Sequence, residues 1–435
     1  MNRTTNRKNK KLNMRRGFAS VARVIRAKPL QTVLCFCFPA LVCVIKGQEV
    51  LMPRPVYSVT PTAMREFQTN GMDVFASPET GAATSPEMPP FKWGPVDFRP
   101  HAFYQFLSGS GIPAAASNHV STVIQKISPG LLINFGSHWA LDYSPVWSFY
   151  SNKEFKNKFD NNAILTGWAT YESWVFGLSQ SYISSSSPLV ETGTQTDTET
   201  WLTGLGATNR LNSKMTIDLS ANQNIVSAKN LNSYDEWSTL DWLNYEFLPQ
   251  LYGGLGGGLG YVNVSGGSNM TYEQVQARMG WRATDKISFQ IHGGLEVRQF
   301  EGGSDLLNPV GGALIQYQPF EFTKLSATVD RTVDPSYFEN EVIESTDIVG
   351  DLNQRLLGKI YLDLVGSYHT IRYVAVGSSA TVRTDDYYTF STRLRSTFLK
   401  HGLISVFYQH GYNSSTAPGF TFSSDQIGFE LGYRF

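Results

Sequence analysis

The sequence predicts an all-β fold, a membrane-spanning antiparallel up-and-down β-barrel of about 18 strands within a range of 16 to 20. Three observations lead to this prediction. Apolar and polar residues alternate along many segments, as expected of strands with one greasy and one wet face. Short and longer connections alternate between these segments. Finally, the 435-residue chain ends inside such a segment, IGFELGYRF, on the aromatic Phe435.

The first 47 residues resemble an export signal. They hold 11 of the 36 Lys and Arg residues and none of the 36 Asp and Glu residues, and the apolar run LQTVLCFCFPALVCVI follows at residues 30–45. This order is typical of a secretory signal peptide, and the run is short for a membrane anchor. All three cysteines lie in this segment, so the mature chain has none, which suits export through an oxidising compartment. We expect residues 1–47 to be removed near Gly47.

The remaining chain is acidic. It carries 25 basic and 36 acidic residues, a net charge of about −11, which argues against a nucleic-acid partner. Residues 48–92 are rich in Pro, Thr, Ser and Gly and lack a sustained period, so they predict a flexible arm in the periplasm. A tether and an arm that reaches into the barrel both remain open.

Residues 93–435 carry the predicted barrel, because two classes of connection alternate along them. Eight tight turns are expected near residues 136, 172, 212, 249, 284, 319, 357 and 400. Nine longer connections are expected at residues 108–117, 151–157, 184–197, 227–233, 265–269, 301–305, 334–341, 377–380 and 413–419. Together they separate 18 strands and place both chain ends on the side of the tight turns, which faces the periplasm in outer-membrane barrels.

The alternation also predicts which face is wet. Ile287, Phe289 and Ile291, for example, alternate with polar residues. Side chains cannot fill a closed barrel of 18 strands, so its interior suits the polar row, and the apolar row faces lipid. Aromatic residues near strand ends are expected to form the interfacial girdles, with Trp139, Tyr245, Phe247, Tyr387 and Phe398 as examples.

Charged residues on the inner row are the candidate lumen and selectivity residues. By parity they include Arg278, Arg282, His292, Glu296, Arg298, Asp347, Asp351, Arg355, Arg393 and Arg395. Facing acidic and basic walls would create a transverse field that selects solutes. The alternative is that these groups form ion pairs that stiffen the wall. The glycine-rich segment LYGGLGGGLGYVNV, residues 251–264, predicts either a smooth inner wall or a strongly bent strand.

The last strand explains why the chain ends on an aromatic residue. An alternating final strand that closes with an aromatic carboxy-terminal residue resembles the signature by which outer-membrane barrels are recognised for assembly. This resemblance implies that Phe429, Leu431, Tyr433 and Phe435 engage the barrel-assembly machinery. The same residues also suit the lipid face of the last strand, and both interpretations can hold.

The region from FKWGPVDFRPHAFYQF onward resembles the β-barrel porin type 2 group, outer-membrane proteins encoded with exopolysaccharide export systems. The features that carry the resemblance are Gly94-Pro95, Arg99-Pro100, the SPG at residues 128–130 and the repeated hairpins. The resemblance covers about four fifths of the chain and implies a barrel rather than a particular cargo.

The sequence therefore predicts an outer-membrane, porin-like channel for polar solutes or saccharides. Its expected partners are outer-membrane lipids, the assembly machinery, and polysaccharide or small polar solutes. A structural or surface-adhesive barrel with a closed lumen is the alternative. A hydrolase is less favoured, since only His410, near Ser414 and Ser415, suggests a catalytic group. No cofactor or metal site is expected, because no histidine has zinc-binding spacing.

Overall fold

The computed structural model describes residues 91–376, 381–399 and 401–434. The predicted signal peptide, residues 48–90 of the predicted arm, the connection at residues 377–380 and Phe435 lie outside the described residues. The strands, in chain order, are β1 (Phe91–Trp93), β2 (Val96–Ala115), β3 (Asn118–Phe135), β4 (Trp139–Tyr143), β5 (Val146–Tyr150), β6 (Lys158–Asp160), β7 (Asn162–Tyr171), β8 (Trp174–Leu189), β9 (Thr194–Arg210), β10 (Met215–Ala228), β11 (Tyr234–Leu248), β12 (Leu251–Val264), β13 (Met270–Thr284), β14 (Ile287–Phe300), β15 (Leu306–Phe320), β16 (Thr323–Pro335), β17 (Glu341–Leu357), β18 (Ile360–Ala375), β19 (Thr381–Phe398), β20 (Gly402–Ser415) and β21 (Phe422–Arg434). Among these residues, no helix is long and apolar enough to cross a membrane.

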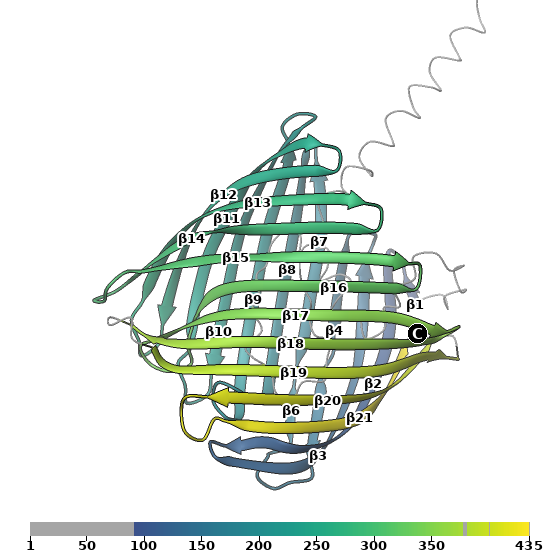
Figure 1. Ribbon diagram of the computed structural model, residues 1–435. Helices are drawn as coiled ribbons and strands as arrows, with labels where there is room; N and C mark the ends of the chain where they lie inside the picture. Colours follow the sequence, from purple (N-terminus) through teal and green to yellow (C-terminus); the bar gives the residue numbers. More distant parts are fainter. Residues whose placement is uncertain (1–90, 377–380, 400, 435) are drawn as a thin grey trace, which may run out of the picture. The chain divides into compact units, whose positions relative to one another are not determined.

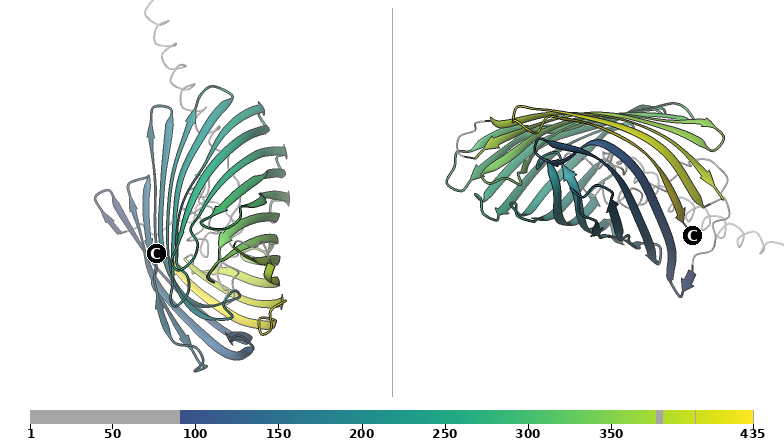
Figure 2. Two further views of the ribbon diagram at one scale, coloured as in Figure 1. Left: turned by 90° about the vertical axis from the view of Figure 1, so that its left-hand side faces the viewer. Right: turned by 90° about the horizontal axis from the view of Figure 1, so that it is seen from below.

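These strands form one closed antiparallel sheet of 18 positions, which confirms the predicted fold. β4 and β5 both pair with β3 and share one position, because Pro145 has no N–H for the ladder. β6 and β7 share the next position, and the short β1 pairs with the start of β2. The barrel closes where β21 pairs with β2, from His101–Arg434 to Ser110–Asp425. Figures 1 and 2 show the last strands lying beside the first as the sheet curves round.

Most predicted turns lie where the sequence places them, but two of the longer connections are shorter than predicted. Residues 172–173 join β7 to β8, and Gly358, with a φ of 53°, lies in the turn between β17 and β18. Residues 108–117, however, are mostly strand, since β2 runs through Ala115. Residues 184–197 are also mostly strand, since β8 ends at Leu189 and β9 begins at Thr194. In both cases small and hydroxylated residues, which are typical of loops, extend the hairpin instead.

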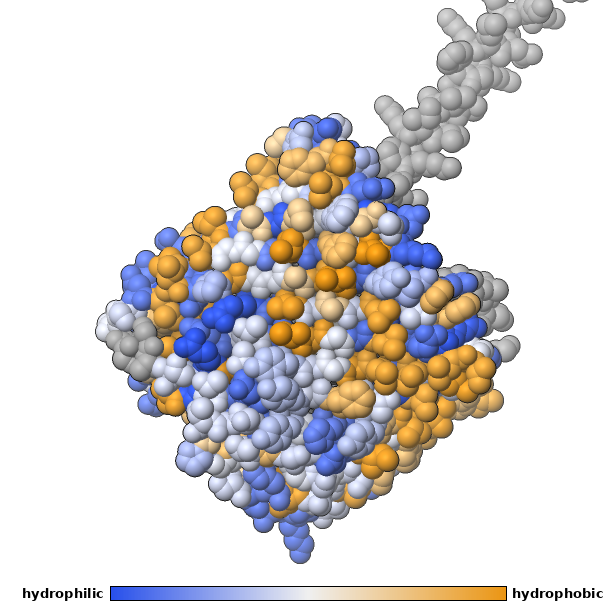
Figure 3. Space-filling view, in the orientation of Figure 1, coloured by the Kyte–Doolittle hydropathy of each residue, from blue (hydrophilic) through white to orange (hydrophobic). Residues whose placement is uncertain are grey.

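The two faces of the sheet differ as predicted. Apolar side chains on the outer face are exposed, such as Leu255 at 70% and Val275 at 69%, whereas the neighbouring inward Gln276 is only 6% exposed. Figure 3 shows hydrophobic side chains gathered over this face of the barrel. Tyr387 is the exception among the predicted girdle residues, because it is fully buried on the inner face. Its neighbour Tyr388 is the exposed member of that pair.

Candidate functional site

The inner wall carries four arginines in a shared arrangement. Each guanidinium lies over an aromatic ring and pairs with a carboxylate, a geometry that suits the flat, delocalised charge of Arg. The four sets are Arg278 with Trp242 and Asp218, Arg298 with Tyr272 and Glu296, Arg383 with Tyr373 and Asp385, and Arg395 with Tyr361 and Asp363. The charges are therefore balanced within one strand or between strands at most three positions apart, rather than across the barrel.

Glycines of β12 make room for two of these sets. Gly256 and Gly260 face inward, and a Cβ at either position would collide with the ring of Trp242 or Tyr272, respectively. Because Gly256 and Gly260 have no side chain, the two rings lie against the backbone of β12. The guanidinium groups of Arg278 and Arg298 stack on these rings, 4.3 Å and 4.6 Å from the ring centres. The glycine-rich segment is thus a bed for aromatic rings from both neighbouring strands, β11 and β13, and not a bare wall.

A second inner feature is a transverse row of histidines and aspartates. Through the ladder registers, His292, Gly312, Asp330, Asp347 and His369 lie side by side on β14 to β18. His369 Nδ1 lies 2.6 Å from Asp347 Oδ1, and His292 Nε2 lies 3.9 Å from Asp330 Oδ1. A Cβ on Gly312 would collide with Asp330, so the glycine makes this approach possible.

The other predicted lumen residues also lie on the inner row but are not gathered in one place. Asp351 accepts a hydrogen bond from Ser326 Oγ, and Arg355 Nε donates to the Gly358 carbonyl in a tight turn at 2.5 Å. Arg393 lies opposite Asp363 in the ladder, and Arg282 lies opposite Ser288 near the tight-turn end. No group of three or more His, Cys, Asp or Glu side chains that could hold a metal ion occurs in the described part of the chain.

The sheet opens between β15 and β16 at the outer end of the barrel, while β17 stays paired with β18 as far as Glu341–Ala375. Pairing between β15 and β16 stops at Gly311–Arg331, whereas β16 and β17 remain paired as far as Pro335–Val342. We call residues 332–345 the infolded hairpin. Its Val333, Tyr337 and Val342 belong to a buried apolar cluster that includes Val262 and Phe300 from the inner faces of β12 and β14. The hairpin therefore packs inward across the outer mouth.

The infolded hairpin contacts residues 190–193, the connection between β8 and β9 on the opposite side of the barrel. Glu191 Oε1 accepts hydrogen bonds from Ser336 Oγ at 2.9 Å and from Tyr337 N at 2.8 Å. Counted round the barrel from β2, β8 and β16 are eight positions apart, close to the maximum of nine for 18 positions. The contact therefore spans the barrel.

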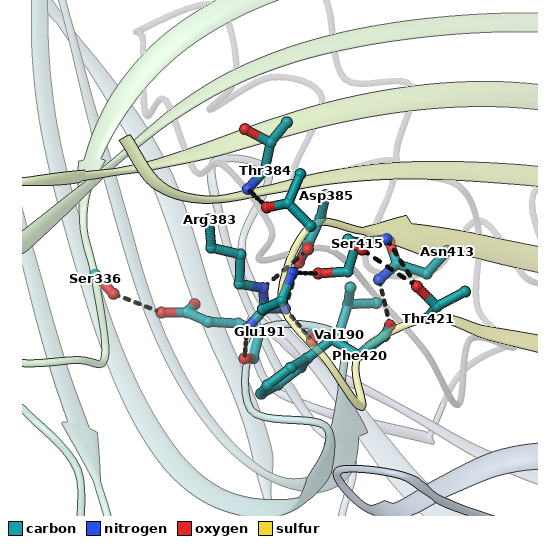
Figure 4. A network of polar contacts seen from close by, with 12 residues as sticks. Val190, Glu191, Ser336, Arg383, Thr384, Asp385, Asn413, Ser415, Phe420 and Thr421 are labelled. Carbon is teal, nitrogen blue, oxygen red and sulfur yellow. Dashed lines mark hydrogen bonds and ion pairs between the residues drawn. The ribbon is translucent and has the colours of Figure 1, made fainter. Parts of the chain in front are cut away.

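We call the contact between the infolded hairpin and residues 190–193 the outer bridge. Arg383 of β19 holds it in place. Its guanidinium donates to the carbonyl oxygens of Val190 at 3.1 Å and Glu191 at 2.9 Å, pairs with Asp385, and lies 3.7 Å from the ring centre of Phe420 (Figure 4). Arg383 and Asp385 are buried. Inward parity on β19 is a signal that could have identified Arg383, but no sequence pattern links it to a connection 192 residues away.

The closing seam holds a buried carboxylate. Glu430 on the inner face of β21 accepts hydrogen bonds from Gln105 Nε2 of β2 at 3.1 Å and from Ser405 Oγ of β20 at 2.5 Å. On the outer face of the same strand, Phe429 stacks on Phe106 of β2 with ring centres 5.4 Å apart. Leu431 is 38% exposed on that face and Tyr433 is half-buried. The inner glutamate of the last strand thus helps to join the first and last strands.

The suggestive residues near His410 do not assemble as a serine hydrolase site. His410 Nδ1 lies 2.8 Å from Asp425 Oδ1 on the outer face, and Tyr408 donates to the same oxygen at 2.7 Å. Ser415 Oγ accepts instead from Ala417 N at 3.1 Å. Within the described ranges, no hydrogen bond joins His410 to Ser414 or Ser415.

A closed barrel with an apolar outer face and a polar inner face satisfies its backbone within a bilayer and is the architecture of outer-membrane proteins. The protein is a membrane-spanning β-barrel of this class, located in the outer membrane.

Comparison with known proteins gives distant structural likenesses. No protein-family model and no curated protein matches the chain. Among solved structures it is similar to OpdO of Pseudomonas aeruginosa, with 14% identity over 78% of this chain and 97% of that chain and a TM-score of 0.44. It is also similar to OpdK of Pseudomonas aeruginosa with vanillate, with 9% identity over 78% and 98% of the chains and a TM-score of 0.42. OccAB3 of Acinetobacter baumannii shares 8% identity over 78% and 100%, with a TM-score of 0.43.

Proposed function

We propose that the barrel is a porin-like channel that passes polar solutes or saccharides across the outer membrane. The carrying observation is the division of the wall: 18 closed positions with polar and charged side chains inside and apolar side chains outside. Side chains alone cannot fill a barrel of this size, so its interior holds water or inserted segments. Reconstitution into planar bilayers tests the proposal, because a channel gives discrete conductance steps and an empty bilayer or a sealed barrel gives none.

The inner charges have two candidate roles in this channel: a transverse field that selects solutes, or ion pairs that stiffen the wall. The predicted transverse field would need unbalanced walls, whereas Arg278, Arg298 and Arg395 each have a carboxylate partner nearby. This pairing favours the second interpretation, in which the charges mainly stiffen the wall. Reversing Arg393 and Arg395 to Glu discriminates between them. A change in the cation-to-anion permeability ratio supports the field, and an unchanged ratio overturns it, with Arg210→Glu at the tight-turn end of β9 as the control.

A structural or adhesive barrel with a closed lumen is the second candidate, and the outer bridge is the observation that favours it. The bridge spans the mouth, and the inward Tyr387, Asp385 and Asn413 are fully buried. Both candidates share the outer-membrane fold, so conductance decides between them. A barrel that inserts into bilayers and conducts nothing would support the closed form and contradict the channel.

Export, assembly and cargo complete the proposal. The sequence supports a cleaved signal peptide at residues 1–47, a periplasmic arm at residues 48–92, and recognition of the last strand by the barrel-assembly machinery. Exopolysaccharide association rests on the resemblance to the type 2 group. Deleting residues 431–435 tests the assembly step. Loss of the barrel from the outer membrane supports recognition, and undiminished insertion contradicts it.

A further inference from the structure

The outer face of β7 to β11 differs from an ordinary lipid-facing surface. A groove of about 460 Å³ lies there, with Phe176, Leu205 and Trp139 of the neighbouring β4 among its larger outward side chains. Besides Leu178 and Leu219, the rest of the lining includes the small residues Gly167, Ala169, Gly177, Gly206, Ala207 and Ala221. Small residues let two protein surfaces approach closely in a bilayer, where no hydrophobic effect drives association between spans.

Polar side chains lie beside this groove, on the outward row of the same strands. Thr203 Oγ1 lies 2.7 Å from Gln180 Oε1 and 3.1 Å from Gln223 Oε1. One hydroxyl hydrogen serves only one of these acceptors at a time, so the cluster has spare hydrogen-bonding capacity. Trp201 and Trp237, both exposed aromatic residues, lie next to the cluster in the outward rows, which places the cluster at the edge of the apolar belt.

Asp241 brings a carboxylate to the end of the groove. It occupies the outward row of β11 between the exposed Trp237 and Leu243, opposite Gly257 of β12. The β10–β11 ladder is interrupted here, between Asp218–Trp242 and Asn222–Ser238. Asp241 Oδ1 accepts from Ser220 N at 2.9 Å, and Ser220 Oγ bridges the gap by donating to the Leu240 carbonyl at 2.8 Å. The flanking β9–β10 and β11–β12 ladders are continuous at this height.

Lipid tails do not complement this surface. Asp241 Oδ2 and the side-chain amide nitrogen of Gln223 have no hydrogen-bond partner among the described residues, and hydrocarbon offers neither donors nor acceptors. A protein surface that carries both hydrogen-bond donors and acceptors would complement these groups. This face has carboxylate and amide oxygens as acceptors and amide N–H groups as donors, so it complements a copy of itself.

We propose that this face is the contact between two copies of the chain in the membrane. Two barrels inserted in the same direction present the same patch to each other around a twofold axis along the membrane normal, the commonest arrangement of protein dimers. In this dimer the bulky outward side chains of one groove, such as Phe176 and Leu205, pack against the small residues of the other. Asp241 and Gln223 then meet polar atoms of the partner instead of lipid.

Single-cysteine cross-linking in intact membranes tests the interface directly. The barrel has no cysteine of its own, so the variants are expressed behind a cysteine-free export leader. Ala207→Cys and Ala221→Cys place the thiol in the proposed face, and Ala327→Cys on the outer face of β16 is the matched control. Oxidation is expected to give dimers only from the first two. Equal cross-linking at all three positions, or none at Ala207 and Ala221, would overturn the proposal.

A second experiment removes the Asp241 carboxylate, which the proposed dimer pairs with polar atoms of the partner. Leucine at this position is compatible with lipid but cannot form the polar contact. Asp241→Leu should therefore lower the dimer association constant about tenfold, which corresponds to about 1.4 kcal/mol. Native mass spectrometry or light scattering in mild detergent measures this constant. If Asp241→Leu fails to fold, Gln223→Leu carries the same expectation without touching the ladder gap. Dimers of unchanged affinity in the folded variant would contradict the polar contact, and monomeric wild-type protein in membranes would contradict the dimer.

Discussion

Arg383 donates a hydrogen bond from Nη1 to the backbone carbonyl oxygen of Glu191 at 2.9 Å, although 192 residues separate them in the chain. One residue belongs to β19 and the other to the connection between β8 and β9, on the far side of the barrel. The same guanidinium pairs with the buried Asp385. A single arginine thus links the wall, the crossing connection and, through Glu191, the infolded hairpin.

Removing the Arg383 guanidinium should loosen the outer bridge. In Arg383→Met the connection at residues 190–193 loses two hydrogen bonds, and we expect a larger single-channel conductance in planar bilayers. The variant should also lose about 3–5 kcal/mol of stability, because Asp385 remains buried without its counter-charge. The double variant Arg383→Met/Asp385→Leu separates the two effects by removing that charge. Arg210→Met, whose guanidinium bonds only its own turn, is the control. Unchanged conductance in both bridge variants would contradict this role.

Gly260 and Gly257 should respond in opposite ways to the same substitution. A Cβ at Gly260 collides with the Tyr272 ring, whereas a Cβ at Gly257 has nothing within 4 Å. Gly260→Val should therefore cost about 1–3 kcal/mol, as overpacking does. Gly257→Val should be neutral or stabilising, since valine suits a strand. Urea unfolding in lipid vesicles measures both, and equal midpoints would show that Tyr272 moves aside without cost.

Glu430 should stabilise the closing seam. Glu430→Ala leaves Gln105 Nε2 and Ser405 Oγ without their acceptor in a buried place, at a cost of about 1–3 kcal/mol. Glu430→Gln keeps one acceptor oxygen and should lose less. The temperature at which the folded band disappears from a detergent gel reports the difference, with Glu321→Ala in an exposed turn as the control. Identical transition temperatures for Glu430→Ala and Glu321→Ala would show that the Glu430 carboxylate does not stabilise the closing seam.

The orientation of the sheet can be tested on one strand. Ile291 is 51% exposed on the outer face of β14, and Gln290 precedes it on the inner face. Ile291→Arg should cost about 2–4 kcal/mol near the bilayer midplane, as arginine does on the lipid face of such barrels. Gln290→Arg faces the wet interior and should cost clearly less. Folding yields into phospholipid vesicles compare them, and a reversed order would mean that the faces are assigned wrongly.

Local chemistry carried most of the fold prediction. Alternation along β14 and the positions of turns such as residues 172–173 depend on neighbouring residues, so the sequence reveals them. The extended hairpins at residues 108–117 and 184–197 were missed because their small and hydroxylated residues are typical of loops. Tyr387 and Tyr388 are adjacent and aromatic, so composition alone does not say which one faces out; parity with Arg393 and Arg395 places Tyr387 inside.

The candidate site was less accessible from the sequence. Inward parity found Arg278, Arg298 and Arg395, but the partners that balance their charge include residues on strands up to 60 positions away. The outer bridge depends on the separation of β16 from β15 beyond Arg331, which the periodicity of the sequence does not indicate. The glycines of β12 were interpreted as bare backbone, because the rings that cover them come from β11 and β13.

The pairing of β2 with β21 also has a consequence for biogenesis. A chain that lacks β21 cannot close the sheet, because the facing edges of β2 and β20 then have no partner strand. Such a chain would expose two strand edges with unpaired backbone N–H and C=O groups, which are prone to aggregation and accessible to proteases. β21 therefore protects the edges of both neighbouring strands from this exposure.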